Sequence, residues 1–148
     1  MVKFLLILVF GSSLLYCRDE PKKVNLVNDG SHYDSITGLH VFYITESMPY
    51  YSDKETSFSQ DMGRYLMNNF TYESADDHIF SFDIAFVIDK KGNLVGQRIM
   101  DKKEVDLTAV EKRLLYVLGK MSKWHPGIHN GEKVAVLLRV PISFHPKE

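Results

Sequence analysis

The sequence predicts an α+β fold, a small and mainly antiparallel sheet with two helices packed on one face. Two segments alternate apolar and polar residues with period two, and two others repeat apolar residues every three or four positions. Their order is helix, strand, strand, helix, strand, which is typical of such a sandwich. The chain has 148 residues, 45% of them hydrophobic, which suffices for one core but not comfortably for two.

The segment 79–88 is expected to be the central strand. A turn at 89–93 should follow it, because Gly92 or Asn93 can adopt the positive φ that hairpin turns require. The segment 94–101 would then return as an antiparallel partner. Five large apolar residues share one face of the first strand, namely Phe80, Phe82, Ile84, Phe86 and Ile88.

Two segments have the periodicity of amphipathic helices. Residues 61–70 form the first, and residues 106–124 form the second, with Asp106 as its N-cap. If both apolar stripes face the central strand, one core cluster should form. We expect that cluster to contain Phe82, Ile84, Phe86, Leu114, Leu118 and Trp124.

The last strand is expected at 134–144, where apolar residues again alternate. Pro141 lies inside it and has no N–H, and prolines in sheets are confined mainly to edges and bulges. We therefore predict that this is an edge strand. These three strands make the core of the sheet, and the short run 41–44 is available as a fourth, N-terminal strand.

The N-terminus is typical of an export signal. Lys3 precedes an apolar stretch from Phe4 to Tyr16, about 13 residues long, whereas a membrane-spanning helix needs about 20. Cys17, the only cysteine, follows directly and is the expected lipid anchor. We expect a signal peptide at 1–16, a polar tether at 17–38 and one domain at 39–148. The alternatives are an ordinary signal peptide with an incidental cysteine, and an uncleaved anchor.

Charge and composition exclude several classes of function. Lys and Arg total 18 against 19 Asp and Glu, with no basic stripe, so we expect no nucleic-acid partner. His125 and His129 are four residues apart, but Pro126 and Gly127 between them prevent the helix that would place both on one zinc ion. No nucleophile motif or phosphate-binding loop is present. We expect no catalytic residues, no metal and no cofactor.

Four ordered blocks at 86–94, 121–127, 130–134 and 140–144 resemble the TonB C-terminal domain family. The resemblance extends over roughly 40–146 and implies a stand-alone member, because family members of full length carry an inner-membrane helix and a Pro-rich spacer that are not seen here. The residues that match the family motif, to which we assign structural roles, are Tyr72, Asp89, Gly92, Trp124, Pro126, Gly127 and Pro141.

The resemblance implies a non-catalytic module that binds an extended peptide by β-strand addition. The expected partner is a segment of a TonB-dependent transporter or another envelope protein, in transmembrane transport. The expected location is the outer membrane, facing the periplasm. The alternative is a structural homodimer, paired through the same edge. The predicted peptide-binding residues are Val134, Val136, Leu137, Leu138, Arg139 and Val140, and proline at 136 or 138 is expected to abolish binding.

Overall fold

The computed structural model describes residues 29–51, 58–71, 80–122 and 124–144. The helices are α1 (Phe58–Asn69) and α2 (Ala109–Leu118), with a single 3₁₀ turn, η1 (Glu104–Asp106), between β5 and α2. The strands are β1 (His32–Asp34), β2 (Leu39–Val41), β3 (Tyr50–Tyr51), β4 (Phe80–Ile88), β5 (Leu94–Ile99), β6 (Trp124–His125), β7 (Gly127–His129), β8 (Glu132–Val134) and β9 (Val136–Phe144). The predicted α+β class is confirmed.

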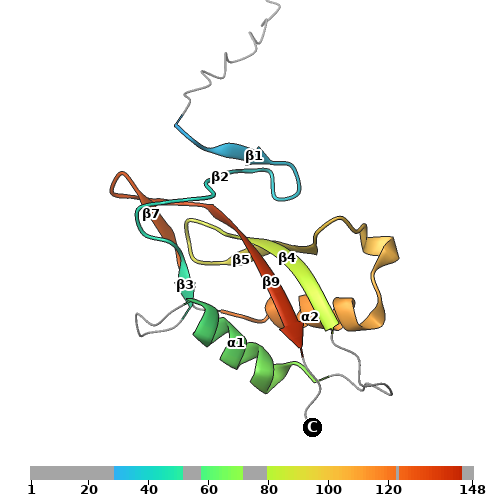
Figure 1. Ribbon diagram of the computed structural model, residues 1–148. Helices are drawn as coiled ribbons and strands as arrows, with labels where there is room; N and C mark the ends of the chain where they lie inside the picture. Colours follow the sequence, from blue (N-terminus) through green and yellow to red (C-terminus); the bar gives the residue numbers. More distant parts are fainter. Residues whose placement is uncertain (1–28, 52–57, 72–79, 123, 145–148) are drawn as a thin grey trace, which may run out of the picture.

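The main sheet has three strands in the order β5–β4–β9, with both pairs antiparallel (Figure 1). β4 is central, as the sequence predicts. Its register with β9 is continuous, from Phe80 opposite Phe144 to Ile88 opposite Val136. β9 is therefore an edge strand, as Pro141 predicts. The expected N-terminal strand joins this sheet only through one parallel bridge, between Phe42 and Val136.

One face of the sheet carries the main core. The alternating apolar residues of β4 point to this face and pack against both helices, α1 through Met62 and Leu66. The two helices thus cover the same face, as predicted. All six residues of the predicted cluster belong to this core, namely Phe82, Ile84, Phe86, Leu114, Leu118 and Trp124.

The other face is covered in part by the β1–β2 hairpin. Val41 packs with Val87 of β4 and with Ala135 in a second, smaller buried cluster. In Figure 1 this blue hairpin lies on the opposite side of the sheet from α1 and α2. Residues 29–38, which the sequence assigns to the tether, therefore belong to the folded part, so the predicted boundary at 38 is too late.

Helix α2 is shorter than the predicted 106–124. Thr108, not Asp106, is its N-cap: the Thr108 hydroxyl accepts a hydrogen bond from the Glu111 N–H at 3.2 Å, and the Glu111 carboxylate accepts one from the Thr108 N–H at 2.8 Å. This reciprocal pair is a capping box, which outcompetes an isolated Asp. At the other end the helix stops at Leu118. Trp124, which was expected inside the helix, lies in β6 instead, opposite Tyr51 of β3.

Two further element boundaries differ from expectation. α1 begins at Phe58, earlier than the predicted residue 61. The predicted strand 134–144 is two strands, because Val134 ends β8 and pairs with Gly127, while β9 begins at Val136. Among the described residues no helix is long and apolar enough to span a membrane.

Glu111 should make the stability of the domain depend on pH. Burial alone would raise the pKa of this carboxyl, but hydrogen bonds from the Lys102 ammonium, at 2.6 Å, and from Thr108 hold its pKa below the ordinary value. A lowered folded-state pKa stabilises the fold above the ordinary carboxyl pKa, and this contribution is lost as the pH falls through the folded-state value. Wild type should therefore exceed Glu111→Gln in unfolding free energy at about pH 7, and the difference should shrink towards about pH 3. A difference that does not change with pH would contradict this.

Candidate peptide-binding edge

The outer edge of β9 is the side that faces away from β4. At its start Phe42 occupies this edge: the Phe42 N–H donates to the Ala135 carbonyl at 2.9 Å, and the Leu137 N–H donates to the Phe42 carbonyl at 2.9 Å. The backbone groups of residues 135 and 137 therefore point outward, away from β4. Since groups alternate along a strand, those of Val136 point inward to β4.

The same alternation identifies the outward groups along the rest of β9. The register with β4 has no shift, so Arg139, Pro141 and Ser143 also point their backbone groups outward. Arg139 and Ser143 supply N–H donors there, and all three supply carbonyl acceptors. Pro141 lies where an N–H would point outward, so its ring costs the sheet no ladder bond. Within the described ranges no strand pairs with this edge beyond Leu137.

This geometry moves the predicted binding residues toward the C-terminus. Val134 lies in β8 rather than in β9, and the side chains of Val136 and Leu138 are buried in the core. The N–H groups of Val136 and Leu138 belong to the ladder with β4, so proline at either position would disrupt the sheet rather than act on the edge alone. Val140 is half-buried on the same face.

Leu137 and Arg139 lie on the other face of β9. Leu137 packs beside the second cluster, and Arg139 is exposed. The Arg139 guanidinium pairs with the Asp83 carboxylate of β4, and its Nε lies 3.0 Å from both carboxylate oxygens. This pair lowers the pKa of Asp83 and raises that of Arg139. It holds the Arg139 side chain over the sheet, so only the backbone of Arg139 is directed outward from the edge.

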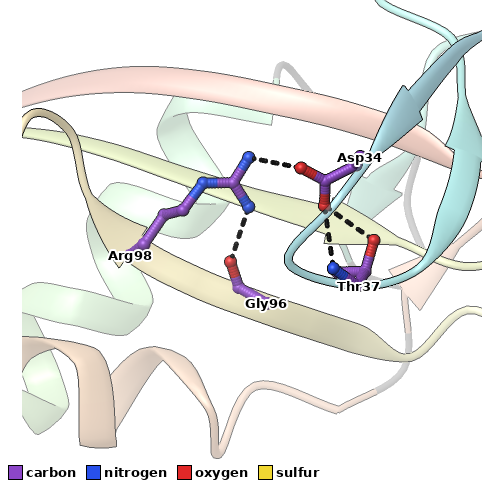
Figure 2. A network of polar contacts seen from close by, with 4 residues as sticks. All are labelled: Asp34, Thr37, Gly96 and Arg98. Carbon is purple, nitrogen blue, oxygen red and sulfur yellow. Dashed lines mark hydrogen bonds and ion pairs between the residues drawn. The ribbon is translucent and has the colours of Figure 1, made fainter. Parts of the chain in front are cut away.

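The edge of β5 is obstructed, unlike that of β9. β5 is bulged near Gly96, whose φ is +63°, and the Gly96 carbonyl accepts a hydrogen bond from Arg98 Nη1 at 3.0 Å. Figure 2 shows how Arg98 also reaches Asp34, at 3.0 Å, which in turn accepts hydrogen bonds from Thr37. The β1–β2 turn is thereby held against β5. Bulges and covering loops are common protections of an edge strand, so β9 offers the more accessible edge.

The family-motif residues lie mostly in one structural cluster beside the start of β9. The Asp89 carboxylate accepts hydrogen bonds from the Lys91 and Asn93 N–H groups at 2.8 and 2.9 Å, and closes the β4–β5 turn. Burial raises the pKa of Asp89, but these bonds hold it below the ordinary value. Gly92 of this turn lies against Trp124: a Cβ on Gly92 would be 2.2 Å from the Trp124 carbonyl oxygen and 3.9 Å from Pro126 Cδ.

Gly127 completes this cluster. A Cβ on Gly127 would be 2.5 Å from Val136 Cγ2, so the glycine allows β7 to approach the start of β9. A side chain on Gly92 or Gly127 would thus overlap its neighbours in this cluster. Tyr72 lies outside the described residues.

The two histidines that flank Pro126 and Gly127 are held by aromatic contacts. His125 stacks on Tyr50 with ring centroids 4.2 Å apart, and His129 lies 4.6 Å from Phe42. They belong to different short strands, β6 and β7. In the part of the chain that the structure describes, no group of three His, Cys, Asp or Glu residues could hold a metal ion.

A cavity of about 830 Å³ lies between β5 and α2. Its lining is apolar at Leu107 and Leu115 and cationic at Lys103 and Lys112. Glu104 and Tyr116 are also among the described residues that line it.

Sequence reasoning missed two residues of the edge. Phe42 was expected only in an optional strand, yet it occupies the start of the β9 edge, and Ser143 was not among the predicted binding residues. The signal for Ser143 was Pro141: a proline in an edge strand points its missing N–H outward, and the alternation of the backbone then directs the groups of Ser143 to the same side. No family model, curated protein or solved structure matches this chain. Its function therefore has to be proposed from the geometry of the edge and from the resemblance.

Proposed function

We propose that this protein is a non-catalytic, TonB-like module of the cell envelope that binds an extended peptide along the outer edge of β9. The observation that carries the proposal is the outward N–H and carbonyl groups of Arg139 and Ser143, which no described strand pairs. An edge strand with such groups is a template for an added strand. The TonB-like sequence blocks support the same mode of binding.

The expected affinity is modest. Residues 139–143 offer two donors and three acceptors, and each added backbone hydrogen bond contributes about 0.5 to 1.5 kcal/mol. The five bonds sum to at most about 7.5 kcal/mol, and the costs of association are subtracted from this sum, whereas a micromolar complex needs about 8.2 kcal/mol. The backbone bonds alone are therefore expected to give dissociation constants weaker than about 1 µM. The partner we propose is an extended segment of a TonB-dependent transporter or of another envelope protein.

Photo-crosslinking in cells can test the edge before the partner is identified. A photo-reactive phenylalanine analogue at position 139, on β9, should yield a conjugate with another envelope protein. The same analogue at Tyr116, an exposed residue of α2, should not. Ser143→Pro removes an outward N–H without removing a bond to β4, and should reduce the conjugate at least about fivefold.

Ser143→Ala is the matched control. Both Ser143 variants lose the 3.0 Å contact between the Ser143 and Ser81 hydroxyls, but Ser143→Ala keeps the N–H and should leave the conjugate unchanged. Conjugates from position 116 and none from 139 would refute the proposal. Conjugates only with a second copy of this chain would replace it with the homodimer.

The proposed anchor is a lipid on Cys17, which lies outside the described residues. The mature protein should begin at Cys17, with a mass that includes acyl chains, since two or more chains suffice for stable membrane attachment. Cys17→Ala should release the protein into the soluble periplasmic fraction. An N-terminus elsewhere, or an unmodified Cys17, would contradict this part of the proposal.

A further inference from the structure

The apolar face of β9 is incompletely covered beside its open edge. Val140, Ile142 and Phe144 point to the core face but are only half-buried. Their neighbours on β4 are covered, with Phe82 7% exposed and Ile84 fully buried. Val136 and Leu138, on the same face of β9, are buried beside Phe42, so the partial exposure begins where Phe42 no longer occupies the edge.

The opposite face of the same segment is open and largely polar. Arg139, Pro141 and Ser143 are exposed there, and Arg139 is already neutralised by Asp83. Apart from the Pro141 ring, this face therefore offers polar side chains, and between residues 139 and 143 it offers no unpaired charge to a strand added at the edge. The two faces of this edge thus differ in chemistry.

Residues directly opposite each other on neighbouring strands point to the same face of a sheet. A ligand residue opposite Val140 or Ile142 would meet the half-buried apolar face of β9. The ligand residues between them would meet solvent beside Arg139 and Ser143. Phe42 occupies the edge at residues 135–137, so the added strand is confined to the C-terminal half of β9.

We propose that the ligand of this edge is an amphipathic extended segment, with apolar side chains at alternate positions that cover Val140 and Ile142, and with polar residues between them. This inference rests on the proposed function. It adds that the edge selects its ligand by the alternation of apolar and polar residues in the ligand. The apolar area that such a ligand covers adds to the affinity from the backbone hydrogen bonds.

Two synthetic peptides of equal composition test the inference on the full chain. Each has about ten residues, roughly the length of β9, with lysine at both ends. One alternates valine and threonine, and the other carries the valines and the threonines in two separate blocks. Fluorescence anisotropy should show that the alternating peptide binds at least about tenfold more tightly, the equivalent of about 1.4 kcal/mol.

A matched pair of variants locates the effect. Ile142→Thr keeps a β-branched side chain but makes the half-buried apolar face more polar, and should weaken the alternating peptide several-fold. Ser81→Thr, on the other face of the sheet and in the neighbouring strand β4, should not. Circular dichroism and unfolding of each variant show whether the fold is retained, and the peptide comparison on wild type does not depend on either variant.

The outcomes separate this inference from the proposed function. If both peptides bind equally and Ser143→Pro abolishes their binding, selectivity for an alternating ligand (the alternation rule) is wrong, whereas strand addition at the edge is supported. Binding of neither peptide would overturn the rule as well, while the conjugates formed in cells from position 139 would decide independently on strand addition. Tighter binding of the blocked peptide would also overturn the rule.

Discussion

Replacing Phe86 by alanine should lower the free energy of unfolding by about 3 to 5 kcal/mol. Phe86 is fully buried on the central strand β4, and its ring lies 5.6 Å from that of Trp124. Removing the ring leaves a cavity where the sheet meets the helical layer, and the close-packed neighbours can collapse into it only in part. Small domains have about 5 to 15 kcal/mol of stability in total, so the variant should be close to unfolding.

Urea unfolding monitored by circular dichroism measures this loss. The control is Met67→Ala on α1, where the side chain is 72% exposed and its removal should cost less than about 0.5 kcal/mol. A loss below about 1 kcal/mol for Phe86→Ala would mean that the inward face of β4 is not the one described.

Gly92→Ala should be the most damaging replacement of glycine by alanine among the described residues. Gly92 has a φ of +83°, and an added Cβ would lie 2.2 Å from the backbone oxygen of Trp124. Left-handed backbone alone costs a non-glycine residue about 1 to 3 kcal/mol. The overlap adds to this, because a backbone oxygen cannot move away like the end of a side chain. We expect a total loss of about 3 kcal/mol or more in unfolding free energy.

Gly131→Ala separates the two causes. Gly131 also has a positive φ, +74°, but a Cβ added there would have no atom within 4 Å. It should therefore lose only the conformational part, about 1 kcal/mol. If Gly92→Ala were no more destabilising than Gly131→Ala in the same urea experiment, the close approach of the β4–β5 turn to Trp124 would be wrong.

Local patterns in the sequence predicted most of the fold. The period-two alternation of 79–88 identified the central strand and its inward face, and the helical periods of two segments placed both helices on that face. Pro141 identified the edge strand, because a missing N–H is tolerated only where no neighbour needs it. Gly92 identified a turn that needs positive φ. Each of these rules depends on residues close together in the chain.

Other features depended on contacts between distant segments. No local sequence pattern in residues 29–38 distinguishes a polar tether from a β-hairpin. The hairpin is stabilised by the ion pair of Asp34 with Arg98 and by the packing of Val41 against Val87. The start of α2 was predictable in principle from Thr108 and Glu111, but Asp106 is an equally good cap when considered alone. His125 and Trp124 form a strand only because Tyr50 and Tyr51 lie opposite them.

The sequence by itself determined that β9 alternates and that it lies at an edge. Pro141 already favours the phase in which the backbone groups of residues 139, 141 and 143 point outward, because a missing N–H costs no ladder bond there. Only the tertiary structure decided that Phe42 occupies this edge at residues 135–137 and that no described strand pairs with it beyond Leu137. The two hydrogen bonds of Phe42 reveal that phase, and the register with β4 carries it to Ser143. The candidate site is therefore 139–143 rather than the predicted 134–140. Side-chain alternation depends on one strand alone, whereas an N–H is left without a partner strand only by the arrangement of the whole sheet.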